Sequence, residues 1–369
     1  MPESKQHITV VVAMSGGVDS SVAAALLLDR GYAVIGITMK TYDFDHVGGN
    51  IDNETSCCGL DAMNDARMVA VKLGIPHYVV DFTEPFSKEV INNFIDEYLE
   101  GRTPNPCIIC NKKIKWGELL KKAGSLGASC IATGHYARIH FDETTKRYTI
   151  LRALNAEKDQ SYALWGLSQE ALGKTIFPVG ELTKTEVRQI ASRYGLRTAN
   201  KEESFEICFV ADNNYRRFLK ERIPDLDSRI GKGEIVFDGK IAGKHLGFPF
   251  YTIGQRGGLG AFGEKVYVTD IDAKTNTITI GRKNDLLHRG LIAKDVNFVG
   301  IASLNGGLRV QAMVRYRDMP TVATVIAEED GRVRLVFDEP KRAITPGQSV
   351  VMYDGERLVG GGVIERIVS

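Results

Sequence analysis

Apolar and polar positions alternate in two different ways along this chain. Over residues 1 to about 140, short apolar runs of β-type residues are separated by segments with helical spacing. The expected strands are Ile8–Ala13, Ala33–Met39, His77–Phe82 and Cys130–Thr133. Strands that alternate with helices predict an α/β domain whose mostly parallel sheet is covered by helices on both faces.

Two of the intervening helical segments end at clear stop signals. Asp61–Leu73 stops before Gly74, and Phe86–Leu99 stops before Gly101. From about 150 to 225 the pattern is helical. There Thr183-Lys184-Thr185-Glu186 has the spacing of a capping box, which predicts a helix that closes at Gly195.

Beyond Ser228 glycine becomes frequent and short β-type runs dominate. Their close spacing predicts small sheets or β-barrels. We place a division near Asp285, and the expected domains are therefore 1–225, 226–285 and 286–369. The expected strands are Glu234–Phe237, Lys265–Ile271, Thr277–Ile280, Arg309–Arg315, Val322–Ile326, Val333–Phe337 and Val350–Tyr353.

Composition narrows the class of protein. The 369 residues are 43% hydrophobic and 25% charged, as in ordinary globular proteins. No apolar run is long enough to span a membrane and no signal pattern is visible, so we expect a cytoplasmic protein without a membrane partner. The net charge is only +1, so binding of a polyanion would need local basic patches. Such patches occur at 111–115, 216–222 and 315–317.

The most distinctive chemistry lies between the first strand and the first helix, at Met14–Ser21. Gly16 and Gly17 let the backbone approach a ligand closely, and the first N–H groups of a helix bind anions. The hydroxyls of Ser15 and Ser20 add donors. No Lys follows Gly17, so this is not a Walker A loop, and adjacent glycines do not fit the dinucleotide fingerprint. The segment predicts a cradle for a phosphate chain; the alternative is a Gly-Gly turn without a ligand.

Three strand ends are expected to converge on this cradle. Ser15 follows the first strand, Met39 ends the second, and Gly134-His135 follows the fourth. Ligands of parallel α/β sheets bind at the carboxyl ends of the strands. This convergence supports a nucleotide site independently of the glycines.

Cysteines supply a second candidate chemistry. Cys107 and Cys110 form a C-x-x-C motif in a proline-constrained loop, and Cys208 lies further along the chain. The pair fits a thiol redox site, half of a zinc knuckle or, together with Cys208, three ligands of an iron–sulfur cluster. Lys112 and Lys113 would favour thiolates at this motif. Simple burial remains an alternative for Cys208.

The other three cysteines have structural interpretations. Cys57 and Cys58 fall in the long polar loop Tyr42–Gly59, which is expected to be mobile, and Cys130 falls inside a strand. We therefore assign no chemistry to them.

The motif S-G-G-x-D-S resembles the signature of the PP-loop ATP pyrophosphatases. With the cysteine motif, nearly the whole chain resembles the bacterial tRNA-specific 2-thiouridylases. This resemblance implies a PP-loop domain, a small central β domain and a C-terminal β-barrel. Its marks are Met14–Ser21, Met39-Lys40, Gly101–Pro106, Cys110–Lys112, Thr133–Ala137, Lys158–Tyr162, Glu181–Lys184, Ile207–Phe209, Tyr251–Arg256 and Pro346–Gln348.

The resemblance implies thiolation of a tRNA at its wobble uridine. ATP, with Mg²⁺, adenylates the C2 position of the base and pyrophosphate leaves; sulfur then displaces AMP. The implied role of Cys208 is to carry a persulfide received from a cysteine desulfurase or a sulfur relay protein. Cys110 is the implied partner thiol, through a transient disulfide. Asp19 is the expected catalytic carboxylate and a candidate Mg²⁺ ligand.

The remaining site residues follow from matching motif positions. The implied ATP-binding residues are Ala13, Met14, Ser15, Gly16, Gly17, Val18, Asp19, Ser20, Met39 and Gly134. Asn105, Pro106 and Cys107 would lie at the target base. The implied tRNA contacts are His135, Lys158, Asp159, Gln160, Arg315, Tyr316 and Gln348.

One position departs from the family pattern. Well-described members have Asp where this chain has Cys107, and this change creates the C-x-x-C motif. It raises the hypothesis that Cys107, Cys110 and Cys208 bind a [4Fe–4S] cluster whose open iron carries the sulfur. The persulfide hypothesis predicts instead a Cys110–Cys208 disulfide in oxidised protein.

Two other functions fit parts of the sequence. One is a different PP-loop adenylating enzyme, such as an ammonia-using amidating synthetase, which would need neither the cysteines nor the β-rich half. The other is a non-catalytic RNA-binding or sulfur-carrier protein with a decayed loop, which the intact Ser15–Ser20 segment opposes. We expect a monomer.

Overall fold

The chain divides into two units, which are described separately. The computed structural model describes residues 8–42, 60–202, 207–210 and 212–368. The chain passes between the units several times. The first unit comprises 1–90, 107–213 and 356–358, and the second comprises 91–106, 214–355 and 359–369.

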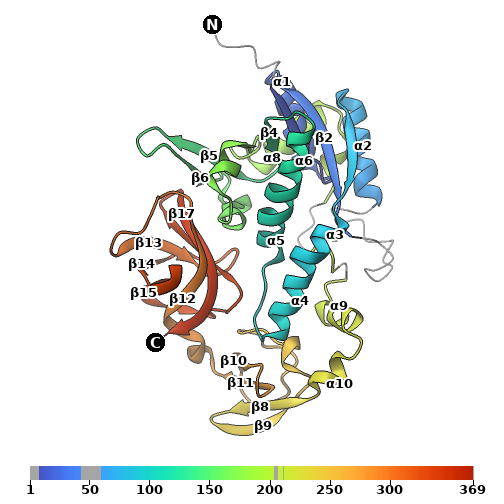
Figure 1. Cartoon of the computed structure of the whole chain (residues 1–369). Coiled ribbons are helices and arrows are strands. Elements are labelled where there is room, and N and C mark those ends of the chain that lie inside the picture. Colours follow the sequence, from blue (N-terminus) through green and yellow to red (C-terminus); the bar gives the residue numbers. More distant parts are fainter. Residues whose placement is uncertain (1–7, 43–59, 203–206, 211, 369) are drawn as a thin grey trace. The chain divides into compact units, whose positions relative to one another are not determined.

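A parallel five-stranded sheet forms the centre of the first unit (Figure 1), in the order β3–β2–β1–β4–β7. Val10–Ala13 of β1 are all buried, and successive strand residues face opposite sides, so both faces of the sheet are covered. The predicted parallel sheet is confirmed. Its strands are β1 Thr9–Ala13, β2 Ala33–Lys40, β3 His77–Asp81, β4 Cys130–Ala132 and β7 Thr175–Ile176.

Helices α1 Val18–Asp29, α2 Leu60–Leu73 and α8 Lys184–Arg193 share one apolar core with this sheet. The capping box at α8 is present as predicted, with Thr183 as the N-cap and Glu186 reaching back to it. The other elements of this unit are α3 Thr83–Phe86, the start of the π-helical η3 Ser87–Ile91, α5 Pro106–Ile109, the π-helical η4 Cys110–Leu119, α6 Leu120–Ser125, η5 Ala156–Lys158, η6 Ser161–Leu164, α7 Gln169–Gly173 and η7 Arg197–Asn200.

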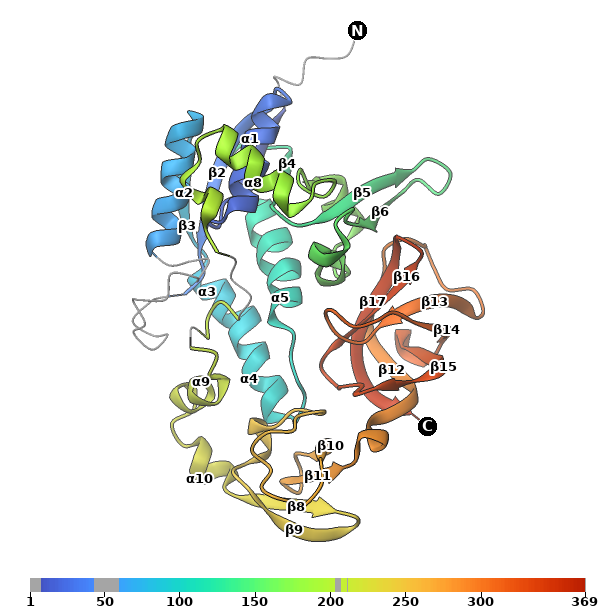
Figure 2. The ribbon, with the colours of Figure 1, turned by 180° about the vertical axis from the view of Figure 1, so that it is seen from behind.

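The second unit contains a four-stranded sheet and a closed six-stranded barrel (Figure 2). The sheet has the order β10–β11–β8–β9, and the barrel closes through pairing of β12 with β17. Leu291, Val310, Leu335 and Met352 are among the buried residues of the barrel core. The predicted combination of an α/β domain, a small central β domain and a C-terminal barrel is confirmed.

The elements of this second unit are α4 Asn92–Leu99, α9 Tyr215–Arg222, α10 Leu226–Ile230, β8 Gly233–Phe237, β9 Lys240–His245, η8 Phe248–Phe250, β10 Tyr267–Asp272, β11 Thr277–Gly281, η9 Lys283–Leu286, β12 Leu287–Phe298, β13 Leu308–Met313, β14 Thr321–Ala327, η10 Glu329–Gly331, β15 Val333–Arg342, β16 Ser349–Asp354 and β17 Arg357–Val368. The exact domain limits stay a prediction.

Several differences from the predicted elements have physical reasons. The hairpin β5 Ala137–Asp142 and β6 Arg147–Arg152 was missed, because charged residues interrupt its apolar alternation. Strands β9, β12 and β17 were also missed: β9 is largely exposed, β12 carries charged residues, and β17 contains three consecutive glycines. The helix predicted over Phe86–Leu99 is instead divided by a π-helical turn.

Candidate functional site

The turn between β1 and α1 has the features of an anion site. Among the described residues, no side chain caps the N-terminus of α1, whose N-cap is Gly17. The first N–H groups of a helix lack intrahelical partners and attract anions. The Ser20 hydroxyl receives a hydrogen bond from the Ser15 N–H at 3.2 Å and donates to the Gly17 carbonyl at 3.2 Å. The Ser15 hydroxyl lies 3.4 Å from that of Ser20, so the two hydroxyls lie together in the turn.

Gly16 shows why the turn needs glycine. Its φ of +72° lies in the left-handed region, and a Cβ atom there would sit 2.1 Å from the carbonyl oxygen of Ala62 in α2. No side chain fits that space. Gly16 therefore sets both the backbone path of the cradle and its close packing against α2.

Asp19 in the first turn of α1 is held by two residues from distant segments. Lys184 Nζ donates to both carboxylate oxygens, at 2.8 and 2.9 Å, and the Tyr136 hydroxyl donates to Oδ1 at 2.7 Å. The side chains of Lys184 and Asp19 are 13% and 28% exposed, so the pair is partly shielded from water. An ammonium group is thus fixed beside the helix N-terminus by its ion pair with Asp19.

The strand ends meet as predicted. β1, β2 and β4 are parallel neighbours, so the segments after Ala13, Lys40 and Ala132 leave the same edge of the sheet. A Cβ on Gly134 would lie 2.6 Å from the backbone nitrogen of Ser20, which puts Gly134 against the cradle. Thr38 in β2 donates to the Met14 carbonyl at 2.8 Å and fixes the entry to the turn.

The expected tRNA contacts of the first unit have internal partners. His135 is hydrogen-bonded to the Thr133 hydroxyl at 2.6 Å, and burial followed by the charge of Lys115 holds its pKa well below the ordinary value. The Gln160 side chain accepts from the Tyr136 N–H at 3.0 Å. The Asp159 carboxylate accepts from Ser161 and from the Ala153 N–H. These side chains organise the segment that also carries Lys158.

The C-x-x-C motif lies in a helix and not in a loop, which corrects the prediction. Pro106 opens α5, and Cys110 begins the π-helical segment that follows. Proline is well suited to the first position of a helix, because the N–H it lacks would have no intrahelical partner there. Cys107 is exposed, whereas Cys110 is half-buried. Residues three apart are neighbours on a helix surface.

Cys208 is half-buried and belongs to the same unit as Cys110. Its neighbour Phe209 is fully buried and packs edge-on against Phe86, with ring centroids 5.7 Å apart. Cys130 is partly buried beside the core, and burial raises its pKa. Cys57 and Cys58 lie outside the described residues.

The donor groups of the described chain bear on a possible metal site. Within residues 8–42, 60–202, 207–210 and 212–368, no group of three or more His, Cys, Asp and Glu side chains is arranged to hold a metal ion. Cys107, Cys110 and Cys208 do not form such a group among the described residues, and the iron–sulfur hypothesis stays a prediction. Asp19 already binds an ammonium and a hydroxyl, so it does not by itself form a magnesium site.

The site residues of the second unit centre on the segment before Cys107. Gln348 Nε2 donates to the carbonyls of Thr103 and Pro104, at 3.0 and 2.9 Å. The Thr103 N–H donates to the Pro346 carbonyl, which adds a third bond to the barrel segment. Pro106 is buried and Asn105 half-buried. Gln348, predicted as a tRNA contact, is thus a structural clamp on the chain that leads to Asn105.

Arg315 and Tyr316 are exposed beyond the end of β13. Lys184 is the main residue that sequence reasoning did not assign to the site. It appears in the sequence only as part of the capping box and of the family mark Glu181–Lys184, and its contact with Asp19, 165 positions away, exists only in the folded chain.

Among the described residues, no helix is both long and apolar enough to cross a membrane. Residues 8–212 match the family described as "tRNA methyl transferase HUP domain", residues 216–282 its "PRC-barrel domain", and residues 288–364 the "Aminomethyltransferase beta-barrel domain".

Curated relatives match almost the full chain. The "tRNA-specific 2-thiouridylase MnmA" of Salinibacter ruber is 50% identical over 361 residues, which cover 97% of this chain and 94% of that protein. The protein of the same description from Clostridioides difficile is 51% identical over 359 residues, covering 97% and 98%. That of Carboxydothermus hydrogenoformans is 49% identical over 361 residues, covering 97% of each. The chain belongs to the MnmA family of tRNA-specific 2-thiouridylases.

Proposed function

We propose that this protein is an ATP-dependent tRNA-uridine 2-sulfurtransferase that converts a wobble uridine to 2-thiouridine. The observation that carries the proposal is the uncapped Gly-Gly cradle with Lys184 fixed beside it, in a chain about half identical to named 2-thiouridylases. Bound ATP, tRNA carrying a wobble uridine, and a sulfur donor are the partners this reaction needs. The protein acts as a cytoplasmic monomer.

The first step activates the base. The phosphates of ATP bind at Ser15–Ser20, with Ala13, Met14, Met39 and Gly134 around the nucleotide. The C2 oxygen of the flipped uridine attacks the α-phosphorus, the bond to the β-phosphate oxygen breaks, and pyrophosphate leaves. The N–H groups of α1 and the ammonium of Lys184 favour the negative charge that develops on the leaving phosphates.

The second step transfers sulfur. The terminal sulfur of a persulfide on Cys208 attacks C2, and AMP leaves with the former C2 oxygen. The Cys110 thiolate then attacks the Cys208 sulfur and releases 2-thiouridine, which leaves a Cys110–Cys208 disulfide. A thiol reductant restores both cysteines, and a cysteine desulfurase or relay protein reloads the persulfide. The presence of both cysteines in the unit that carries the cradle supports this route.

Cys107 is proposed to lie at the target base with Asn105 and Pro106. His135, Lys158, Asp159, Gln160, Arg315, Tyr316 and Gln348 are proposed to contact or position the tRNA. Magnesium would enter with the phosphates of ATP, because Mg²⁺ in such sites is held largely by substrate oxygens. A [4Fe–4S] cluster held by Cys107, Cys110 and Cys208 remains the alternative route for the sulfur, and no step is derived from it.

The reaction itself is the test. Unmodified tRNA with a wobble uridine should trigger pyrophosphate release from ATP, and tRNA with another base at that position should not. Addition of a persulfide donor should then yield 2-thiouridine in the digested tRNA. Pyrophosphate release that depends on ammonia and ignores tRNA would favour the amidating alternative and would falsify the proposal.

Cys208→Ser separates the two steps. This variant should release pyrophosphate at the normal rate and form no 2-thiouridine, because adenylation needs no thiol. Cys130→Ser is the matched control and should thiolate normally. Normal thiolation by Cys208→Ser would exclude the persulfide role, and iron bound to freshly purified wild-type protein would favour the cluster.

A further inference from the structure

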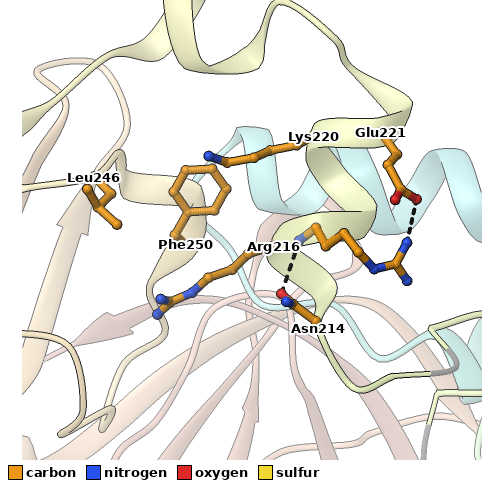
Figure 3. A pocket seen from close by; sticks show the side chains of 7 residues that line it. Asn214, Arg216, Lys220, Glu221, Leu246 and Phe250 are labelled. Carbon is orange, nitrogen blue, oxygen red and sulfur yellow. Dashed lines mark hydrogen bonds and ion pairs between the residues drawn. The ribbon is translucent and has the colours of Figure 1, made fainter. Parts of the chain in front are cut away.

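The second unit contains a positively charged recess that none of the proposed roles uses. It has a volume of about 460 Å³ and lies between α9 and the segment around Phe250 (Figure 3). Its lining includes Arg216, Arg217, Lys220 and Glu221 of α9, with Leu246 and Phe250 of the central β domain. We call it the α9 recess. These side chains carry three positive charges and one negative charge.

Two of the cations are held over aromatic rings. The Arg216 guanidinium lies 5.6 Å from the ring centroid of Tyr251, and Lys220 Nζ lies 5.3 Å from that of Phe250. Both rings are buried, at 3% exposure. Figure 3 shows Arg216 and Lys220 extending past Phe250 toward the side where Leu246 lies. Cations stacked in this way are already oriented, so less side-chain entropy is lost when they bind an anion.

The ion pairs already present in the recess are weak enough for an anionic ligand to replace them. Lys220 pairs with Asp227 at 2.7 Å and Arg217 with Glu221 at 2.5 Å. Asp227 and Glu221 are 62% and 45% exposed. Such exposed pairs contribute little, so they exchange readily for a stronger charge-assisted contact.

The recess is linked to the chain segment before the proposed target-base residues. Tyr215, the neighbour of Arg216, stacks on Tyr98 with ring centroids 4.8 Å apart. Tyr98 lies in α4, five positions before Thr103, and the Thr103 hydroxyl donates to Thr252, which follows Tyr251, at 3.3 Å. Thr103 lies two positions before Asn105. The framework that holds the proposed target-base segment therefore also fixes Arg216.

We propose that the α9 recess binds a backbone phosphate of the tRNA substrate, with Arg216 and Lys220 as its cationic contacts. The inference rests on the proposed function. A polyanion is the required substrate, yet the net charge of the chain is only +1, so affinity must come from local concentrations of cations. A recess of nucleotide size suits one phosphate better than it suits a protein surface, which needs a far larger contact area.

The test is the salt dependence of tRNA binding. Arg216→Gln/Lys220→Gln keeps polar side chains of similar reach and removes two charges. Its Kd for unmodified tRNA should rise about tenfold, and the slope of log Kd against log salt should fall by about one to two. Pyrophosphate release at saturating tRNA should stay at the wild-type rate. Arg216→Lys/Lys220→Arg should keep the wild-type slope, because the slope follows charge.

Lys240→Gln/Lys244→Gln is the matched control, since it removes two charges from exposed positions of β9 in the same domain. It should leave Kd and slope unchanged. The proposal is overturned if the recess variant has the wild-type Kd for tRNA, or if the control variant loses as much tRNA affinity as the recess variant. A recess variant that binds tRNA normally but fails to receive sulfur would also overturn it, because the recess would then bind an acidic protein partner. Wild-type protein that binds no tRNA would instead refute the proposed function.

Discussion

At the scale of single residues, charge at the cradle depends on one shared carboxylate. Asp19 receives hydrogen bonds from the Lys184 ammonium and the Tyr136 hydroxyl, and it lies in the first turn of α1. A carboxylate at a helix N-terminus is stabilised by the partial charges there. Here it also fixes the ammonium beside the site. Asp19 thus acts as a positioning group for Lys184 as well as a member of the signature motif.

Replacement of Asp19 by its neutral isostere tests this role. Asp19→Asn should lower tRNA-dependent pyrophosphate release by about 100-fold or more, because Lys184 loses its fixed position. The Kd for tRNA should not change. Asp29→Asn, at the opposite end of α1, is the matched control and should release pyrophosphate normally. Equal rates in the two variants would contradict the role of Asp19.

The lowered pKa of His135 predicts that the stability of the protein depends on pH. Burial, and then the positive charge of Lys115, lower its pKa well below the ordinary value of 6.5, so the folded protein holds it neutral. As pH falls below about 6.5, the unfolded chain binds a proton that the folded chain does not, and the free energy of unfolding decreases.

His135→Gln should therefore lose less stability than wild type between about pH 7 and pH 5. The measurement is urea unfolding at each pH, with His140→Gln, at an exposed position of β5, as the control. Identical pH profiles for wild type and His135→Gln would show that His135 is not held neutral.

At the scale of elements, the β1–α1 turn and α2 are fitted to one another through Gly16. Its positive φ and the nearby Ala62 carbonyl each exclude a side chain. Sequence reasoning predicted the turn and the need for glycine from local pattern. The contact with α2 could not be predicted from the sequence, because α2 starts more than forty positions later and packs there only in the folded chain.

Two glycine variants separate these effects. In Gly31→Ala only the positive φ is unfavourable, since a Cβ at Gly31 has no described atom within 4 Å. This variant should lose about 1 kcal/mol of unfolding free energy. Gly16→Ala adds the clash with Ala62 and should cost about 3 kcal/mol or more, with loss of ATP binding. Urea unfolding midpoints and ATP titration measure both. Equal costs would mean that the contact with α2 relaxes.

At the scale of the whole molecule, the proposed chemistry is divided between the units. Asp19, Gly134, Cys110 and Cys208 belong to the first, whereas Asn105 and the exposed Arg315 belong to the second. With a net charge of +1, the molecule as a whole attracts no polyanion. Binding of tRNA then depends on particular cations.

Arg315→Gln tests one such cation in the barrel. It should weaken tRNA binding and lower the salt slope by about one, because one phosphate contact is lost. Lys283→Gln, also exposed and in the second unit, is the control for loss of a single charge. The prediction fails if both variants change the slope equally.

Local features of this protein were predictable from its amino-acid order alone. The strand and helix alternation, the cradle at Ser15–Ser20 and the capping box at Thr183 depend on residues a few positions apart. Their geometry is set by backbone sterics and short-range hydrogen bonds, which a sequence displays directly. The helix at Cys107 was the local exception, because prolines in a sequence suggest a loop as readily as a helix start.

Only the folded chain decided how these features combine. Lys184 meets Asp19 across 165 positions, and Gln348 holds the carbonyl of Thr103 across 245. The cations of α9 line a recess because the rings of Phe250 and Tyr251 pack against them in the folded chain. Such contacts arise from burial of apolar surface between distant segments, and burial depends on the whole arrangement of the elements.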